Sequence, residues 1–121
     1  MKKLLLLLTL VSAATFSLST VANDDKSMEA ARTIGQIEAF DLYCGAIEMT
    51  SISITGSIYM DMLYEENGGI SNVRSKYPLE VEMAFTERAV LEDTTYGVEV
   101  CAKLRERLKR QGLWNEVFER Y

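Results

Sequence analysis

The sequence predicts a small all-α domain of four or five helices, braced by one disulfide bond. Apolar residues recur every three or four positions through most of the chain, which is the spacing of amphipathic helices. A strand is possible at residues 50–55, where apolar and polar residues alternate, and a second such alternation comprises Leu79, Val81, Met83 and Phe85. The chain also contains two cysteines and an N-terminal export signal, and an even cysteine count in an exported protein favours a disulfide.

The first 22 residues have the three-part form of a secretory signal peptide. Lys2 and Lys3 precede an apolar run of leucines, and no charged residue occurs between Lys3 and Asp24. Small residues predict cleavage after Ala22, with residues 12–14 as an alternative site. The apolar run ends near residue 11, whereas a membrane-spanning helix needs about 20 residues. We therefore expect a periplasmic or, failing that, secreted protein without a stable membrane anchor after cleavage.

Residues 23–121 form the predicted mature domain, and its first helix is expected from Met28 to about residue 47, with Ser27 as the N-cap. Residues 50–57 are ambiguous, because a helical stripe also continues through this stretch. The stripe consists of Ile47, Ile54, Ile58 and Met62. No second β-rich run is available as a partner strand, so a helix is favoured, kinked near Gly45 or Gly56. It should end by about Glu66, before the residues Asn67, Gly68 and Gly69.

The next helix is predicted to begin at Tyr77–Pro78, because proline is tolerated in the first helical turn. Its inward face comprises Leu79, Met83, Thr86 and Val90. Residues 92–95 should interrupt it. A further helix then carries Val98, Cys101, Leu104 and Leu108 inward and ends between Arg110 and Gly112. The apolar residues from Leu113 to Tyr121 should dock on the body of the domain.

The two cysteines, Cys44 and Cys101, allow one pairing, and each lies on the inward face of its predicted helix. The bridge would close a loop of roughly 58 residues, which the chain-entropy estimate values at about 4 kcal/mol. The alternatives are two buried thiols or a redox or metal role. The sequence has no Cys-x-x-Cys motif and no histidine, so the redox and zinc alternatives lack their usual groups. We predict no cofactor and no metal.

The predicted mature chain has 11 basic and 18 acidic residues, a net charge of −7, which disfavours nucleic acid as a partner. No basic residue occurs between Arg32 and Arg74, whereas the last 22 residues carry a net charge of +3. One interpretation is that the acidic helices pack against the basic one. The other is a docking face for a charged partner. The candidate partner-binding residues are Arg105, Lys109, Trp114 and Phe118, although the two aromatic residues also suit the core.

Catalytic groups are scarce. Without histidine there is no Ser-His or Cys-His arrangement, and the sequence contains no glycine-rich phosphate loop. The carboxylate pairs Glu38–Asp41 and Asp61–Glu65 share helix faces, but such pairs on an acidic protein are usually solvated. We therefore predict no catalytic residues.

These observations favour a non-enzymatic periplasmic interaction protein that binds another envelope protein. It would be an inhibitor or immunity-type partner, or an accessory subunit of an envelope assembly. The alternative is a periplasmic stress chaperone or a carrier of lipophilic ligands. The chain is similar in general organisation to the periplasmic acid-stress chaperones, which are also small, exported, helical proteins with two cysteines. It does not share their sequence motifs. The oligomeric state stays open.

Overall fold

The computed structural model describes the backbone of residues 2–121 and the side chains of residues 25–121. The predicted signal peptide, residues 1–22, therefore lies outside the residues whose side chains are described. This part of the chain forms six helices and a two-stranded sheet, which confirms the predicted small, mostly helical domain. The elements are α1 (Lys2–Glu48), β1 (Thr50–Ile52), α2 (Ile54–Glu66), α3 (Ile70–Arg74), α4 (Tyr77–Glu92), α5 (Val98–Arg110), α6 (Trp114–Val117) and β2 (Phe118–Arg120).

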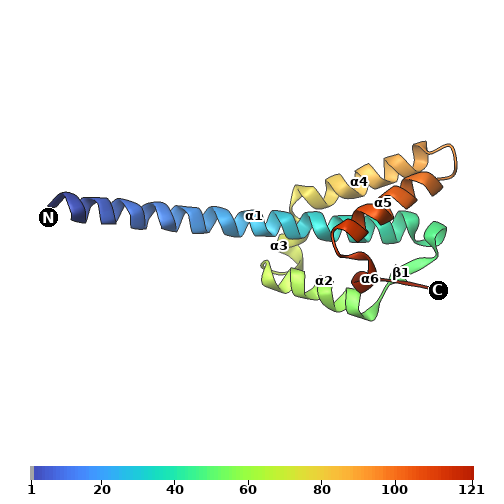
Figure 1. The fold of residues 1–121 in the computed structure, drawn as a ribbon, viewed down its shortest axis with the longest axis horizontal. Coiled ribbons are helices and arrows are strands. Elements are labelled where there is room, and N and C mark those ends of the chain that lie inside the picture. Colours follow the sequence, from blue (N-terminus) through green and yellow to red (C-terminus); the bar gives the residue numbers. More distant parts are fainter. Residues whose placement is uncertain (1) are drawn as a thin grey trace.

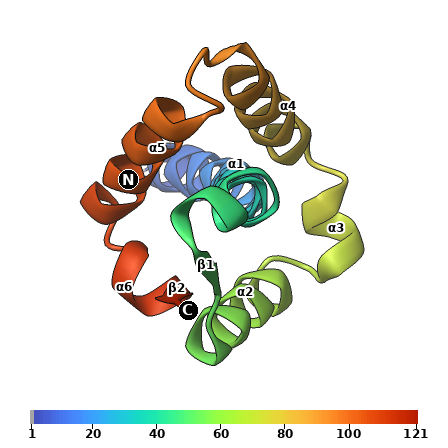
Figure 2. The same ribbon diagram turned by 90° about the vertical axis from the view of Figure 1, so that its right-hand side faces the viewer.

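The C-terminal half of α1 is the centre of the fold. Figure 2 looks along this helix and shows α4, α3, α2, α6 and α5 arranged around it. In Figure 1, α4 and α5 lie on one side of α1 and α2 lies on the other. A helix with neighbours on several sides needs more than one apolar stripe. The buried apolar side chains of α1 are accordingly numerous: Ala30, Ala31, Ile34, Ile37, Ala39, Phe40 and Cys44.

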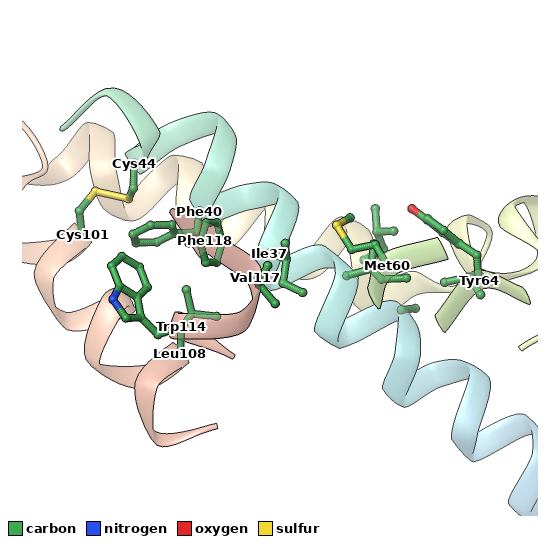
Figure 3. Close-up of a cluster of buried hydrophobic side chains, with 14 residues drawn as sticks. Ile37, Phe40, Cys44, Met60, Tyr64, Cys101, Leu108, Trp114, Val117 and Phe118 are labelled. Atoms are coloured by element: carbon green, nitrogen blue, oxygen red, sulfur yellow. A yellow bond between two sulfur atoms is a disulfide. The ribbon is translucent and has the colours of Figure 1, made fainter. Parts of the chain in front are cut away.

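Aromatic residues and the disulfide close the core at the α5–α6 side of α1. Cys44 and Cys101 are bonded, with their Cα atoms 5.6 Å apart, so the predicted bridge is confirmed. Next to it, the ring of Phe40 meets those of Trp114 and Phe118 edge to face, at centroid distances of 5.4 and 5.1 Å. Figure 3 shows this group beside the disulfide, with Met60 and Tyr64 further along the core. The predicted docking of the C-terminal segment is thus observed.

The expected helix through residues 50–57 is wrong, because a short strand occupies the first part of this stretch. Met49 has a positive φ of 57°, which ends α1 and turns the chain back. Strand β1 then pairs with β2 in antiparallel register, Thr50 opposite Arg120 and Ile52 opposite Phe118. The partner strand consists of the last residues of the chain, which have no β-rich pattern. Consequently no kink at Gly45 or Gly56 is needed, since the break lies between them.

The predicted inward stripe of α2 is also wrong. Ser53 starts a new helix, because its side chain accepts a hydrogen bond from the N–H of Gly56 at 2.9 Å. This restart sets a different helical phase, in which Gly56, Met60 and Tyr64 are buried. The residues expected inside are instead exposed: Ile47, Ile54, Ile58 and Met62. The stripe failed because periodicity was extended across a break in the helix.

Three smaller differences concern helix ends and one connection. Ser27 is not an N-cap but a buried residue within α1, whose hydroxyl donates to the carbonyl of Asn67 at 3.5 Å. The short helix α3 lies between the glycine pair and α4, where no element was predicted. Helix α4 begins at Tyr77 as predicted, and α5 has the predicted bounds, but Val98 is exposed rather than inward.

Candidate functional site

The four predicted partner-binding residues mostly stabilise the fold. Trp114 and Phe118 are 9% and 6% exposed and lie in the core beside Phe40. The guanidinium group of Arg105 donates to both carboxylate oxygens of Glu48 at 2.8 Å, which joins α5 to the end of α1. Lys109 is about half exposed and lies 6.0 Å from the centre of the Trp114 ring. The four residues therefore do not form one exposed surface.

Some of the charged residues form ion pairs between helices of the fold. Besides the Arg105–Glu48 pair, Arg107 of α5 approaches Glu82 of α4 at 3.4 Å. On the other side of α1, Glu38 accepts hydrogen bonds from the hydroxyl of Tyr64 and the guanidinium of Arg74, at 3.1 and 2.6 Å. Burial and then the nearby Glu38 carboxylate raise the pKa of Tyr64, so its hydroxyl stays a donor. Glu38 is thus a structural anchor that ties α2 and α3 to α1.

Helix α2 is unusual because it carries apolar side chains on its outer side as well as on its buried side. Met60 and Tyr64 face α1 and are buried, and Tyr59 and Leu63 are half-buried on one flank. On the outer side, spaced four residues apart, lies a row with exposed fractions of 80%, 57% and 49%: Ile54, Ile58 and Met62. An apolar row on the outer side of a helix is normally covered by a neighbouring element. Within the described residues, no element covers the outer row of α2.

All charged residues of α2 are acidic. The helix contains no lysine or arginine, and its acidic residues lie in the C-terminal half. These are Asp61, Glu65 and Glu66, all of which are exposed. The outer surface of α2 therefore changes from aliphatic near Ile54 to acidic near Glu65. We call this surface, Ile54, Ile58, Met62 and the three acidic residues, the α2 face.

A groove runs along the flank of α2, between this helix and α1. It consists of two hollows that share Glu29 and Thr33 of α1. From α2 it is lined by Tyr59 and Leu63, and its rim is charged with both signs through Lys26, Glu29, Arg32 and Glu66. Burial and then the nearby Glu116 and Glu66 carboxylates raise the pKa of Tyr59. The groove extends the accessible surface of α2 but has no convergent set of catalytic groups.

Neither a ligand chamber nor a metal centre is found in the part of the chain with described side chains. The most enclosed hollow lies between α1, α4 and α5 beside Gln36, Thr86 and Arg107, and encloses about 10 Å³. That volume suits about one water molecule. Among residues 25–121, no three His, Cys, Asp or Glu side chains are grouped so that they could hold a metal ion.

The sequence pattern placed the apolar residues of the α2 face in the core and the pair Asp61–Glu65 in solvent. The signal that could have identified the face was present, since the segment 54–66 has apolar residues on more than one side and lacks cations. Within the described residues, no helix has the length and hydropathy that a membrane span requires. Comparison of this chain with protein-family models, curated proteins and solved structures gave no match.

Proposed function

We propose that this protein is a non-enzymatic, exported binding protein that docks on one partner protein through the α2 face. The observation that carries the proposal is the exposed apolar row Ile54, Ile58 and Met62 on the side of α2 away from its buried residues. Residues spaced by four on one helix are the usual anchors when a helix lies in the groove of another protein. Fully burying one such aliphatic side chain contributes about 1.5–3 kcal/mol, so the three anchors together supply a substantial part of the free energy of binding.

The chemistry of the α2 face defines the kind of partner. Ile54 and Ile58 lie in its N-terminal half, and Met62 lies in its C-terminal half among Asp61, Glu65 and Glu66. A complementary surface has an apolar pocket beside a cluster of lysine or arginine residues. A second copy of α2 does not meet this requirement, because the helix contains no lysine or arginine. The proposal is therefore a basic, apolar partner of a different kind, with electrostatic attraction mainly raising the association rate.

The proposed compartment is the periplasm. The Cys44–Cys101 disulfide suggests a location outside the reducing cytoplasm. The predicted signal peptide supports export, and the envelope then supplies the partner. In that setting the roles that suit a small disulfide-braced domain are an inhibitor or immunity-type protein, or an accessory subunit of an envelope assembly.

The test uses a pair of variants matched in exposure. Ile58 on α2 and Val81 on α4 are both 57% exposed, so Ile58→Glu and Val81→Glu introduce the same charge at equally accessible helical positions. Oxidised mature protein, residues 23–121, is immobilised and exposed to a crosslinked periplasmic extract. One dominant protein should be captured by the parent and by Val81→Glu, and lost with Ile58→Glu. Equal capture by all three proteins would refute docking through the α2 face.

The stress-chaperone alternative is supported by a different observation, the spread of exposed apolar residues over the molecule. Among residues 25–121, fourteen large apolar side chains are exposed, and they come from many parts of the fold rather than from α2 alone. A chaperone would capture many unfolded proteins and suppress their aggregation, and Ile58→Glu and Val81→Glu would weaken it to similar extents. The carrier form of this alternative lacks support, because the most enclosed hollow suits about one water molecule.

A further inference from the structure

Helix α4 carries a second exposed row, with a different spacing from that on α2. Its inner side packs through Leu79 and Thr86, which are 8% and 3% exposed. Figure 2 shows α4 at the periphery of the fold, with one side toward α1 and α5 and the opposite side free. The free side presents residues separated alternately by four and three positions: Tyr77, Val81, Ala84, Arg88 and Leu91. This alternation is the spacing of the contact row in a helix pair.

The row has large side chains at both ends and its smallest in the middle. Tyr77 and Leu91 are 63% and 77% exposed, and each lies seven residues from Ala84. A second α4 running in the opposite direction, with a two-fold axis at Ala84, places each Tyr77 beside the Leu91 of the other copy. The alanine at the crossing point allows the two backbones to approach closely. Phe85, 55% exposed, lies next to the axis, so both copies of this ring meet on the same side.

Charge follows the same symmetry. Glu80 and Arg88 each lie four residues from Ala84, so the axis places Glu80 of each copy beside Arg88 of the other. The dimer therefore contains two such pairs. Both side chains are exposed, and Arg88 forms no ion pair with any residue among those described. On α2, by contrast, the acidic residues would have no basic partner, because that helix contains no lysine or arginine. The order of residues on α4 thus complements itself, which an isologous interface requires.

We propose that two copies of this protein associate through α4, antiparallel about a two-fold axis at Ala84. The interface comprises Tyr77, Val81, Ala84, Phe85, Arg88 and Leu91, with Glu80 as the ionic partner of Arg88. One helix of 16 residues from each copy is a smaller contact than the standard interface of about 1,200–2,000 Å². The dimer is therefore weak and depends on protein concentration. This surface is separate from the α2 face, so the dimer does not depend on the proposed function.

Cysteine crosslinking tests the position of the axis. Ala84→Cys places two thiols at the axis, and mild copper-catalysed air oxidation should link the two copies into a covalent dimer. Ser57→Cys is the matched control, because Ser57 is also exposed in a helix but lies on α2. The native Cys44–Cys101 bond is buried and does not take part. Crosslinking of Ala84→Cys at the same rate as Ser57→Cys would overturn the proposal.

Sedimentation equilibrium of the oxidised mature protein tests the residues of the row. Val81→Glu and Arg88→Glu should shift the protein to monomer, and Ile58→Glu should leave the dimer unchanged. The double variant Glu80→Arg/Arg88→Glu reverses both charges and should restore association that Arg88→Glu alone loses. A parent protein that stays monomeric up to about 1 mM, or a double variant no better than Arg88→Glu, would overturn the proposal. Because partner capture is tested separately with Ile58→Glu, failure of the dimer leaves the α2 proposal unaffected.

Discussion

Replacing Gly56 by alanine should destabilise the protein, although alanine is the better helix former. Gly56 lies in the first turn of α2, where it is buried against the end of α6. A Cβ atom at this position would lie 2.2 Å from the carbonyl oxygen of Val117 and 2.9 Å from its carbonyl carbon and Cα. These are backbone atoms, so the contact cannot be relieved by turning a side chain. The chain around Val117 must move by about 1 Å to reach ordinary van der Waals distance.

The size of the effect follows from three contributions. Alanine is favoured over glycine within a helix by up to about 1 kcal/mol. Overpacking of this kind typically costs about 1–3 kcal/mol. The displaced carbonyl of Val117 also accepts hydrogen bonds from the backbone N–H and the hydroxyl of Ser53, at 2.8 and 3.1 Å, and weakening them costs about 1 kcal/mol each. We expect a net loss of about 2–3 kcal/mol in the free energy of unfolding, or roughly 10 °C or more in Tm.

Urea unfolding followed by tryptophan fluorescence measures this loss. Trp114 is the single tryptophan of the chain and packs in the aromatic cluster, so its emission reports on the α6 side of the core. Ser57→Ala is the control, because Ser57 is the next residue of the same helix and is exposed. Its free energy of unfolding should stay within about 0.5 kcal/mol of the parent. A Gly56→Ala protein as stable as the control would show that the close approach of α2 and α6 is wrong.

Three further predictions concern stability. Cys44→Ala, Cys101→Ala and the double variant should each lose about 4 kcal/mol in urea unfolding, because each opens the same loop of 57 residues; clearly unequal losses would contradict a shared bridge. Thr50→Val should gain about 1 kcal/mol in the same assay, because the buried Thr50 hydroxyl has no hydrogen-bond partner within residues 25–121, and a loss would mean that it is satisfied. Hydrogen bonds from the hydroxyl and N–H of Thr95, and then from the N–H of Val100, lower the pKa of Asp93 below its usual 3.8. The Asp93 carboxylate therefore stabilises the fold above pH 3.8, and this stabilisation is lost as the pH falls through the pKa of Asp93 in the folded protein. Asp93→Asn should therefore be less stable than the parent at neutral pH, with the difference shrinking on acidification, and a difference independent of pH would refute this role.

Local patterns predicted the elements whose signals lie within a few residues. The bounds of α5 follow from the interruption at residues 92–95 and the glycine at 112, and the start of α4 follows from Pro78. The inward face of α4 was also predicted correctly, since Leu79 and Thr86 are buried and Met83 and Val90 pack against the core. In each case one helix has one buried stripe, and the period of 3.6 residues is sufficient to locate it.

The candidate binding surfaces could not be predicted in the same way. Ile54, Ile58 and Met62 continue the stripe of α1 only if the helix is unbroken, and the break depends on pairing between Thr50 and Arg120, which are distant in the sequence. Trp114 and Phe118 are of the residue types that often anchor a partner, yet they are buried because they pack against each other and against Phe40 of α1. Exposure is a property of the packed molecule, and residue type alone does not determine it.

The sequence by itself determined that this is a small helical domain with one possible disulfide pairing, few catalytic groups and an excess of acidic residues. Those conclusions rest on composition and on contacts between residues close in the chain. Only the tertiary structure decided which faces of α2 and α4 remain uncovered, where α1 ends and what the last residues do. These features depend on contacts between distant segments, such as Gly56 with Val117 and β1 with β2, and local spacing carries no record of such contacts.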